Sequence, residues 1–480
     1  MKVVLVRPPF YTLFGVATPK MKTYPLNLLY LATYVRERSG HQAAVVDGEN
    51  FCVPGLTLSH GQSEDPEVIM NRGIPRMVEI LSDSEHELWS EMEGKILNLN
   101  PDLIGITCNS GNMDTARVLI SRLKKHGVPV ILGGSHPTVL PGQSLKYTGA
   151  DMVAVGEGEM TLVQVMDSLA SQATFHDIAS LAWNDNGFIR VNQRGSLIKT
   201  IDDLPIPDRS FVSRSEYYGE VIMTARGCPF DCSYCASRNI WGKSVRLRSV
   251  SSIIKELCLL RDSANHAGDR PGRWVVKVVD DTFTVNRKRT LALLDEIIAQ
   301  GLHCFEFTGG VRADTLDETL VAKMREANFR RVTLGVESGS PKILKLIRKG
   351  QTNEDVKRAI RLLRDAGIRS HAFFMIGLPE ETTEDIKLSQ QLILDARPDY
   401  VEVNMVTPYP GTEIFGKLMP CDPSEIDRWY RWFHQGMATH SERLGYDLDL
   451  EYNKFLNFAR KYLASKDQVV TVNSRRLALL

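Results

Sequence analysis

Residues 226–238 read RGCPFDCSYCASR, and this stretch places Cys228, Cys232 and Cys235 at C-x3-C-x2-C spacing. It follows an apolar run, VIMTAR (221–226), and its Gly, Pro, Asp and Ser residues are typical of a loop. Three of the eight cysteines of a 480-residue chain therefore gather in one loop. Thiols grouped in an exposed loop are usually ligands or reactive groups, so the stretch predicts a metal site directly after a β-strand.

Three cysteines in one loop can be interpreted as core residues, as zinc ligands or as ligands of an iron–sulfur cluster. Small apolar core residues would not cluster among turn formers. A structural zinc site needs four ligands, and the remaining cysteines are isolated: Cys52, Cys108, Cys258, Cys304 and Cys421. A 4Fe–4S cluster can be held by three thiolates, which leaves its fourth iron open for a small molecule. The spacing favours this third interpretation, with the open iron as the catalytic position.

Outward from the loop, the second half of the chain alternates strand and helix patterns. Six apolar runs read as strands: VIMTAR, WVVKVVD, CFEFTGG, RVTLGVE, HAFFMIG and YVEVNMV. Six βα units in about 190 residues predict an incomplete (β/α)6 barrel over residues 218–415. Active sites form at the C-terminal ends of such strands, which is where the cysteine loop falls.

The first half of the chain shows a second α/β series. Its five apolar runs are VVLVRPP, AAVVD, LIGITC, PVILGG and MVAVGEGE, with helical patterns between them. They predict a doubly wound, Rossmann-like sheet within residues 1–200. The run LAWNDNGFIRV (181–191) predicts a hairpin that turns at Asn186-Gly187.

The remaining segments show little periodicity. Residues 201–217 contain two prolines and predict a linker between the two domains. Residues 48–83 are rich in Gly, Pro and Ser and predict a loop insertion over one face. Residues 416–480 predict a small helical C-terminal region.

The cysteine motif, with Tyr234 directly before its last cysteine, resembles that of the radical S-adenosylmethionine (SAM) superfamily. The resemblance implies a 4Fe–4S cluster held by Cys228, Cys232 and Cys235, whose open iron chelates SAM. Polar residues at successive strand ends then become SAM contacts by the same resemblance: Tyr234, Asp280, Asp281, Arg312, Glu337, Ser338 and Gly377. The sequence departs from the family's Gly-Gly-Glu tripeptide, since it has VVDDTFT there, a version that resembles the cobalamin-binding branch.

The N-terminal half resembles the cobalamin domain that is fused to that branch. The motifs that carry the resemblance are PLNLLYLA, NSGN, GGSHPTVLP and VGEGE. They imply the following cobalamin contacts: Ser110, Gly133, Gly134, Ser135, His136, Pro137, Gly156, Glu157 and Gly158. The chain has no Asp-x-His, so a His ligand below cobalt from the Asp-x-His-x-x-Gly motif is absent. We expect His136 to contact the corrin side chains or the nucleotide tail rather than cobalt.

Together the resemblances imply a cobalamin-dependent radical SAM methyltransferase. Such an enzyme cleaves SAM to a 5′-deoxyadenosyl radical, abstracts hydrogen from an unactivated carbon and transfers methyl from methylcobalamin; phosphorus is another acceptor. The substrate is expected to be a small biosynthetic molecule. A cyclase or ring-rearranging enzyme without methyl transfer is the alternative, and a non-catalytic corrinoid-binding protein is the third hypothesis.

The composition of the chain indicates which kinds of partner to expect. Lys plus Arg equals Asp plus Glu at 58 each, and residues 421–480 form no basic patch, which argues against a nucleic-acid partner such as the tRNA of a methylthiotransferase. No apolar run is long enough for a membrane span. The N-terminus reads as a strand rather than a signal peptide, so a cytoplasmic enzyme is expected. The chemistry calls for a low-potential electron donor such as flavodoxin or ferredoxin.

Overall fold

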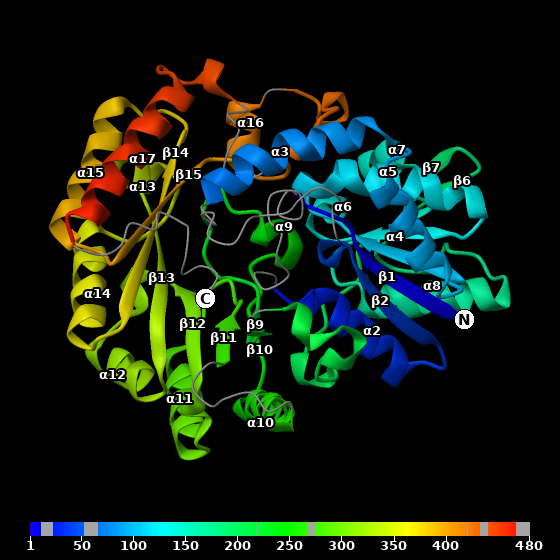
Figure 1. Ribbon diagram of the computed structural model, residues 1–480, viewed down its shortest axis with the longest axis horizontal. Helices are drawn as coiled ribbons and strands as arrows, with labels where there is room; N and C mark the ends of the chain where they lie inside the picture. The colour runs from blue at the N-terminus through cyan, green and yellow to red at the C-terminus, as the bar shows by residue number, and fades with distance from the viewer. Residues whose placement is uncertain are drawn as a thin grey trace.

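The computed structural model describes residues 1–10, 23–51, 66–217, 219–266, 274–419, 421–432 and 440–466. Each half of the chain builds one sheet with helices packed around it, and the two halves lie side by side (Figure 1). The first sheet ends at Val191 and the second begins at Glu220, with the expected linker between them. The domain bounds themselves stay predictions.

The first sheet has seven strands in the order β2-β1-β3-β4-β5-β6-β7. The strands are β1 (Lys2–Arg7), β2 (Gln42–Asp47), β3 (Leu103–Thr107), β4 (Val130–Gly133), β5 (Met152–Ala154), β6 (Leu181–Asp185) and β7 (Phe188–Val191). β1 to β5 are parallel, and the order reverses between β1 and β3, as in a doubly wound sheet. The prediction of this fold is confirmed, and so is the hairpin, because β6 pairs antiparallel with β7.

Helices cover both faces of this sheet. They are α2 (Leu26–Arg38), α3 (Pro66–Ser82), α4 (Glu87–Leu97), α5 (Met113–Leu123), α6 (Ser135–Val139), α7 (Pro141–Thr148) and α8 (Glu159–Ser171). The prediction of a loop over residues 48–83 was wrong for α3. Gly73 and Pro75 suggested a turn, but the helix continues through Pro75. Residues 52–65 of the same prediction lie outside the described part of the chain.

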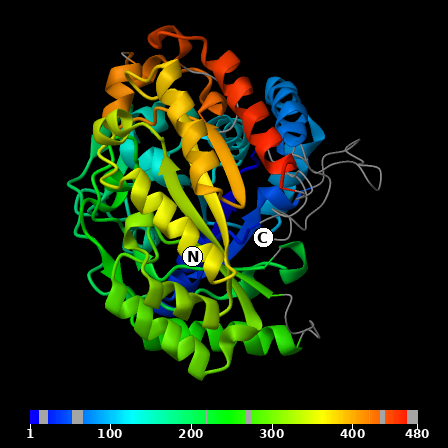
Figure 2. The same cartoon turned by 90° about the vertical axis from the view of Figure 1, so that its left-hand side faces the viewer.

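The second sheet has six parallel strands in chain order, β8-β11-β12-β13-β14-β15, which confirms the partial barrel. The strands are β8 (Glu220–Ile222), β11 (Trp274–Val278), β12 (Phe305–Val311), β13 (Phe329–Glu337), β14 (Arg369–Ile376) and β15 (Tyr400–Met405). The helices are α10 (Val250–His266), α11 (Arg287–Ala299), α12 (Glu318–Glu326), α13 (Pro341–Leu346), α14 (Asn353–Asp365), α15 (Thr383–Ala396) and α17 (Leu448–Ala464). The helices lie on the outer face of this sheet, and its other face turns toward the first half (Figures 1 and 2).

Strand alternation explains which face is covered. Every second residue of the barrel strands, for example Val276, Val332 and Phe374, packs in one apolar core with the outer helices. α14 and α15 begin at capping boxes, Thr352 with Asp355 and Thr382 with Asp385, which fix where each helix starts. Because all six strands are parallel, their carboxyl ends lie together at one edge of the sheet.

The two halves are tied together by a short ribbon and by the C-terminal region. β9 (Ala225–Arg226) pairs antiparallel with β10 (Arg246–Leu247), and α9 (Ser237–Trp241) lies between them. After α16 (Glu413–Leu418) the chain crosses back, and Trp429 and Trp432 pack in the core of the first half. No helix among the described residues is long and apolar enough to cross a membrane.

Candidate functional site

The three cysteines of the motif lie in the loop that follows β9, and all three are partly buried. Gly227 shapes the start of this loop at φ +95°, where a Cβ would approach the Ser244 carbonyl oxygen to 2.0 Å. Its N–H donates to Asp281 Oδ2 at 3.2 Å. No three His, Cys, Asp or Glu side chains of the described residues converge on one ion. Thiolates of a 4Fe–4S cluster bind three different irons, so that observation does not bear on a cluster.

Tyr234, inside the cysteine loop, is fixed to the end of β13. Its hydroxyl donates to Glu337 Oε1 at 2.9 Å, and Lys349 Nζ lies 2.6 Å from the same oxygen. Burial, followed by the Glu337 charge, raises the pKa of Tyr234 well above its usual value. Glu337 has φ +70°, an unfavourable backbone for a non-glycine residue. The predicted SAM contacts Tyr234 and Glu337 thus form one cluster with Lys349, in which Glu337 and Lys349 are buried and Tyr234 is partly buried.

Arg312 lies beneath the same loop. Its guanidinium makes two hydrogen bonds of 2.9 Å to Asp314, and it stacks on the ring of Phe230 with 3.8 Å to the centroid. Phe230 stands between Cys228 and Cys232 in the sequence, so Arg312 supports the loop from the end of β12.

The other strand-end residues differ in accessibility. Asp280 accepts hydrogen bonds from the N–H groups of Thr224 and Ala225, at 2.6 and 3.1 Å, and from the Thr224 hydroxyl. Both of its oxygens therefore bind the chain between β8 and β9, whereas Asp281 is exposed beside the cysteine loop. Ser338 is fully buried, 3.4 Å from the Ser389 hydroxyl. Of these three predicted SAM contacts, Asp281 is the accessible one.

Gly377, after β14, uses its backbone groups within the protein. Its N–H donates to Glu381 Oε2 at 2.7 Å, and its carbonyl oxygen lies 2.8 Å from His440 Nε2. Tyr446 also donates to Glu381 Oε2, at 2.8 Å. Burial raises the pKa of Glu381 to about 7. The C-terminal region is therefore bonded directly to the loop that carries Gly377, one of the predicted SAM contacts.

Replacing Glu381 with glutamine should change how stability depends on pH. The folded-state pKa of Glu381 lies above its ordinary 4.5, so the folded protein binds the proton more tightly than the unfolded chain. Stability from this group is present below pH 4.5 and is lost as the pH rises to about 7. The Glu381→Gln variant should not show this loss. The difference between the urea-unfolding free energies of the two proteins should therefore change, on the order of 3 kcal/mol, between pH 5 and pH 7.5, with the unmodified protein losing the stability. A constant difference across this range would contradict the expectation.

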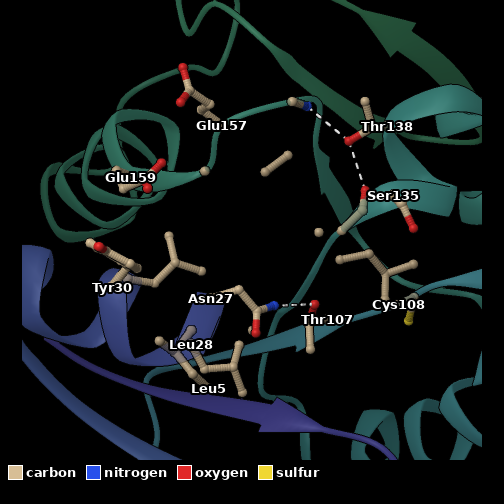
Figure 3. Close-up of a pocket in the computed structure, with 18 of the residues that line it drawn as sticks. Leu5, Asn27, Leu28, Tyr30, Thr107, Cys108, Ser135, Thr138, Glu157 and Glu159 are labelled. Atoms are coloured by element: carbon tan, nitrogen blue, oxygen red, sulfur yellow. Dashed lines mark hydrogen bonds between the residues drawn. The ribbon is translucent and has the colours of Figure 1, made fainter. Parts of the chain in front are cut away.

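A cavity of about 510 Å³ opens at the carboxyl ends of β1, β3, β4 and β5. It is bounded on the other side by residues of the second half, Met223, Arg226, Ile240, Trp241 and Val279. Figure 3 shows Asn27, Thr107, Ser135 and Thr138 around it, with Leu5 and Leu28 on its floor. Of the residues predicted to contact cobalamin, the cavity is lined by Gly133, Gly134, Ser135, Gly156, Glu157 and Gly158.

Small residues and local hydrogen bonds hold the cavity open. Gly134 has φ +106°, and a Cβ on it would lie 2.3 Å from the Cys108 carbonyl oxygen. Thr138 donates to the Gly134 carbonyl oxygen at 2.7 Å and accepts from the Gly156 N–H at 3.0 Å, so the two glycine loops are bonded together (Figure 3). Asn27 donates to Thr107 Oγ1 at 2.8 Å across the floor.

Replacing Gly134 with alanine should destabilise this wall of the cavity. The new methyl group would meet backbone rather than a movable side chain, at a φ that alanine disfavours. We expect a loss of about 2–4 kcal/mol in the free energy of unfolding, measured with denaturant. Gly133→Ala is the matched control, because a Cβ there has nothing within 4 Å and should change stability by less than about 1 kcal/mol. Equal losses in both variants would show that the close approach at Gly134 is not limiting.

His136 and Ser110 lie outside the large cavity. They line a neighbouring cavity of about 220 Å³ with Phe10, Tyr409 and Trp432. The buried His136 ring is 2.9 Å from Ser110 Oγ through Nδ1 and 3.2 Å from Gln143 Oε1 through Nε2. Burial lowers the pKa of His136 to about 4, so the ring is neutral. Pro137 is buried beside it in α6. Both ring nitrogens of His136 thus have partners within the protein.

Glu157, expected as a cobalamin contact, joins the two halves instead of facing the cavity freely. Arg226 lies 2.5 Å from Glu157 Oε1 and 2.7 Å from Glu159 Oε1, and Arg246 lies 2.7 Å from Glu157 Oε2. All four side chains are buried, and Arg226 also stacks over Tyr30 and Trp241. We call Glu157, Glu159, Arg226 and Arg246 the interdomain ion-pair cluster. It links the glycine loop after β5 to the strand that leads into the cysteine loop.

Three residues of the site were not predicted from the sequence: Lys349, Arg226 and Glu159. Lys349 has no local signal, because its partner Glu337 is twelve positions earlier and meets it only through the fold. Arg226 directly precedes Gly227-Cys228, and Glu159 ends the V-G-E-G-E run. The sequence signal for the interdomain ion-pair cluster was the opposite charge of Arg226, before the cysteine motif, and of the glutamates in V-G-E-G-E.

The chemistry of the large cavity suits a bulky neutral ligand. Each charged residue of its described lining is paired, Arg7 with Asp47 and Arg226 with Glu157 and Glu159. The remaining polar lining consists of neutral hydroxyl and amide groups, which match the amide side chains of a corrin ring better than a dinucleotide's phosphates. No histidine is among the described lining residues. The residues present therefore fit cobalamin without a histidine ligand.

Two family descriptions match this chain. Residues 222–393 match the radical SAM superfamily, and residues 13–166 match the B12 binding domain. An uncharacterized methyltransferase from Pyrococcus horikoshii is 30% identical over 427 residues, which cover 86% of this chain and 82% of that protein. The anaerobic magnesium-protoporphyrin IX monomethyl ester cyclase of Rubrivivax gelatinosus is 28% identical over 346 residues, or 68% of this chain and 60% of the cyclase.

A solved structure has the same fold. The radical S-adenosylmethionine methyltransferase TsrM from Kitasatospora setae, with cobalamin and a 4Fe–4S cluster bound, superposes with a TM-score of 0.68 at 19% identity. The match covers 88% of this chain and 78% of that one. It includes both the first sheet and the barrel, so their arrangement is shared.

Proposed function

Because this chain belongs to the family of radical SAM enzymes that carry a B12-binding domain, we propose that it is a cobalamin-dependent methyltransferase. Its acceptor is an unactivated carbon, or phosphorus, of a small biosynthetic molecule. The observation that carries the proposal is the large neutral cavity, which is lined by the glycine loops of the first half and by Arg226 and Trp241 beside the cysteine loop. Because Arg226 precedes the cysteine loop in the chain, a methyl donor held in that cavity would lie next to the loop.

The cofactors supply a 5′-deoxyadenosyl radical and a transferable methyl group, and the protein positions them. Cys228, Cys232 and Cys235 hold the cluster. Tyr234, fixed by Glu337 and Lys349, orders the loop around it. Asp281, exposed beside the loop, is the carboxylate available for the SAM amine. Arg312 holds Phe230 and the loop from below.

The first half holds cobalamin through the backbone of its glycine loops. Gly133, Gly134, Ser135, Gly156 and Gly158 give a ligand close access to N–H and carbonyl groups at the strand ends. Neutral His136 supports this wall through Ser110 rather than as a cobalt ligand. The interdomain ion-pair cluster fixes the distance between the glycine loops and the cysteine loop.

A cyclase without methyl transfer is the second candidate, and the similarity to the Rubrivivax gelatinosus cyclase favours it. We further propose flavodoxin or ferredoxin as the electron donor, a cytoplasmic setting and no nucleic-acid partner. The balanced charge of 58 basic and 58 acidic residues supports the last point.

Methyl-labelled SAM distinguishes the two reactions. The anaerobically purified protein, with cobalamin and a reductant, is offered extracts of candidate small molecules. Label in a product that also requires 5′-deoxyadenosine formation supports methyl transfer. A product formed with 5′-deoxyadenosine but without label supports cyclisation or rearrangement and excludes the methyltransferase.

A further inference from the structure

The inner face of the barrel, opposite the face that packs against the outer helices, carries a row of cations. Lys277, Thr308, Arg331 and Arg369 are paired in register across β11, β12, β13 and β14. Their neighbours Val276 and Val332 pack against the outer helices, so the row points to the other side. We call Lys277, Arg331 and Arg369 the cationic row.

Among the described residues, no carboxylate lies within ion-pair distance of the cationic row, and the charge of Glu402 on the same face acts on Lys277 and Arg331 from a longer distance. None of its three members forms an ion pair with another described residue, and Arg369 donates to the Tyr400 hydroxyl at 3.1 Å. Arg331 is 8% exposed, and its Nε has no hydrogen-bond partner among the described residues. Burial lowers the pKa of Arg331 to about 10. Burying an arginine without such bonds is unfavourable, so the position needs a reason other than stability.

Neighbouring strands add two more buried groups in the same condition. His371 Nδ1 and Asn404 Oδ1 are buried without a hydrogen-bond partner among the described residues. Both lie on the inner face, and His371 Nε2 is 3.4 Å from Glu402 Oε2. Lys277, in contrast, is exposed, so the polar region runs from solvent into the barrel.

We propose that the cationic row binds a carboxylate or phosphate group of a ligand inside the barrel. A guanidinium with free N–H groups is suited to such planar or tetrahedral anions, and Lys277 adds a second charge. Identification of this ligand as the substrate rests on the proposed function. Arg331 is six residues before Glu337, about 20 Å of strand, so the substrate is an extended anion whose charged end lies far from the cysteine loop.

Thermal unfolding of the full-length protein, purified without oxygen and with its cofactors, tests this site without turnover. Inorganic phosphate and succinate are added at constant ionic strength, with chloride as reference. Arg331→Met is compared with Arg358→Met on α14, where the arginine is 45% exposed and 3.0 Å from Asp355. We expect phosphate or succinate to raise the melting temperature of the unmodified protein and of Arg358→Met but not of Arg331→Met. Without anion, Arg331→Met should melt at the same or a higher temperature.

The outcomes separate the possible anions. Protection by phosphate alone identifies a phosphorylated ligand, and protection by succinate alone identifies a carboxylate. Equal protection of all three proteins means an adventitious ion only and overturns the proposal. If Arg331→Met does not fold, the exposed Lys277→Gln takes its place, and unchanged anion protection in that variant overturns the proposal. A protein that fails to transfer methyl can still show the shift, so the two proposals fail independently.

Discussion

Replacing Cys232 with alanine should abolish both SAM cleavage and product formation. Two thiolates cannot hold a 4Fe–4S cluster in place of three, so the variant should be purified without oxygen with little bound iron. We expect the rate of 5′-deoxyadenosine formation to fall at least about 1000-fold, which is roughly 4 kcal/mol in activation free energy. Iron content and 5′-deoxyadenosine release are the measurements.

Cobalamin binding should be unaffected in the same variant, because the large cavity is lined from the other half and by residues that flank the cysteine loop. Cys421→Ser is the matched control, since that thiol lies on the C-terminal segment and should leave iron content and activity unchanged. Retained activity in Cys232→Ala would contradict the cluster interpretation. If the unmodified protein bound cobalamin but neither held iron nor released 5′-deoxyadenosine, a non-catalytic corrinoid-binding protein would be the better hypothesis.

Replacing Arg226 with methionine should destabilise the contact between the two halves and uncouple the reaction. The change leaves the buried Glu159 carboxylate without the arginine that lies 2.7 Å away. Removing one partner of a buried ion pair costs about 3–5 kcal/mol, which we expect in the free energy of unfolding. Loss of the fixed spacing should also raise the ratio of 5′-deoxyadenosine to methylated product.

A second substitution tests whether the buried charge is the cause. In Arg226→Met combined with Glu159→Gln, the uncompensated charge is gone, so part of the stability should return. Arg238→Met on α9 is the control, since its side chain is 45% exposed and should change stability by less than about 0.5 kcal/mol. An unaltered product ratio in a folded Arg226→Met protein would mean that the interdomain ion-pair cluster serves stability alone.

Strands and the cysteine loop were readable from the sequence because each has a local signal. Runs such as VVLVR and LIGIT are continuously apolar, as strands covered on both faces must be, and turn residues mark the ends. Clustered thiols among Gly, Pro and Asp reveal a ligand loop in the same way. α3 was missed because Pro75 lacks the N–H of a helix interior, and local rules therefore predict a break.

The hydrogen-bond and ion-pair partners of the polar residues could not be predicted from the sequence, because they depend on tertiary contacts. Glu157 looked like a ligand contact in a glycine loop, yet two arginines from the ribbon, 69 and 89 positions away, bind it. Asp280 looked like its neighbour Asp281, but the turn between β8 and β9 uses the oxygens of Asp280 and leaves Asp281 exposed. The sequence shows Arg331 in a strand, but not that its Nε is buried without a hydrogen-bond partner among the described residues.

Cobalamin content is the most direct test of the account. The protein is produced with cobalamin, purified without oxygen and denatured, and the released corrinoid and iron are quantified per chain. We expect near-stoichiometric cobalamin together with a 4Fe–4S cluster. Undetectable cobalamin with the cluster intact would contradict the methyltransferase proposal, while the cluster interpretation of Cys228, Cys232 and Cys235 would stand.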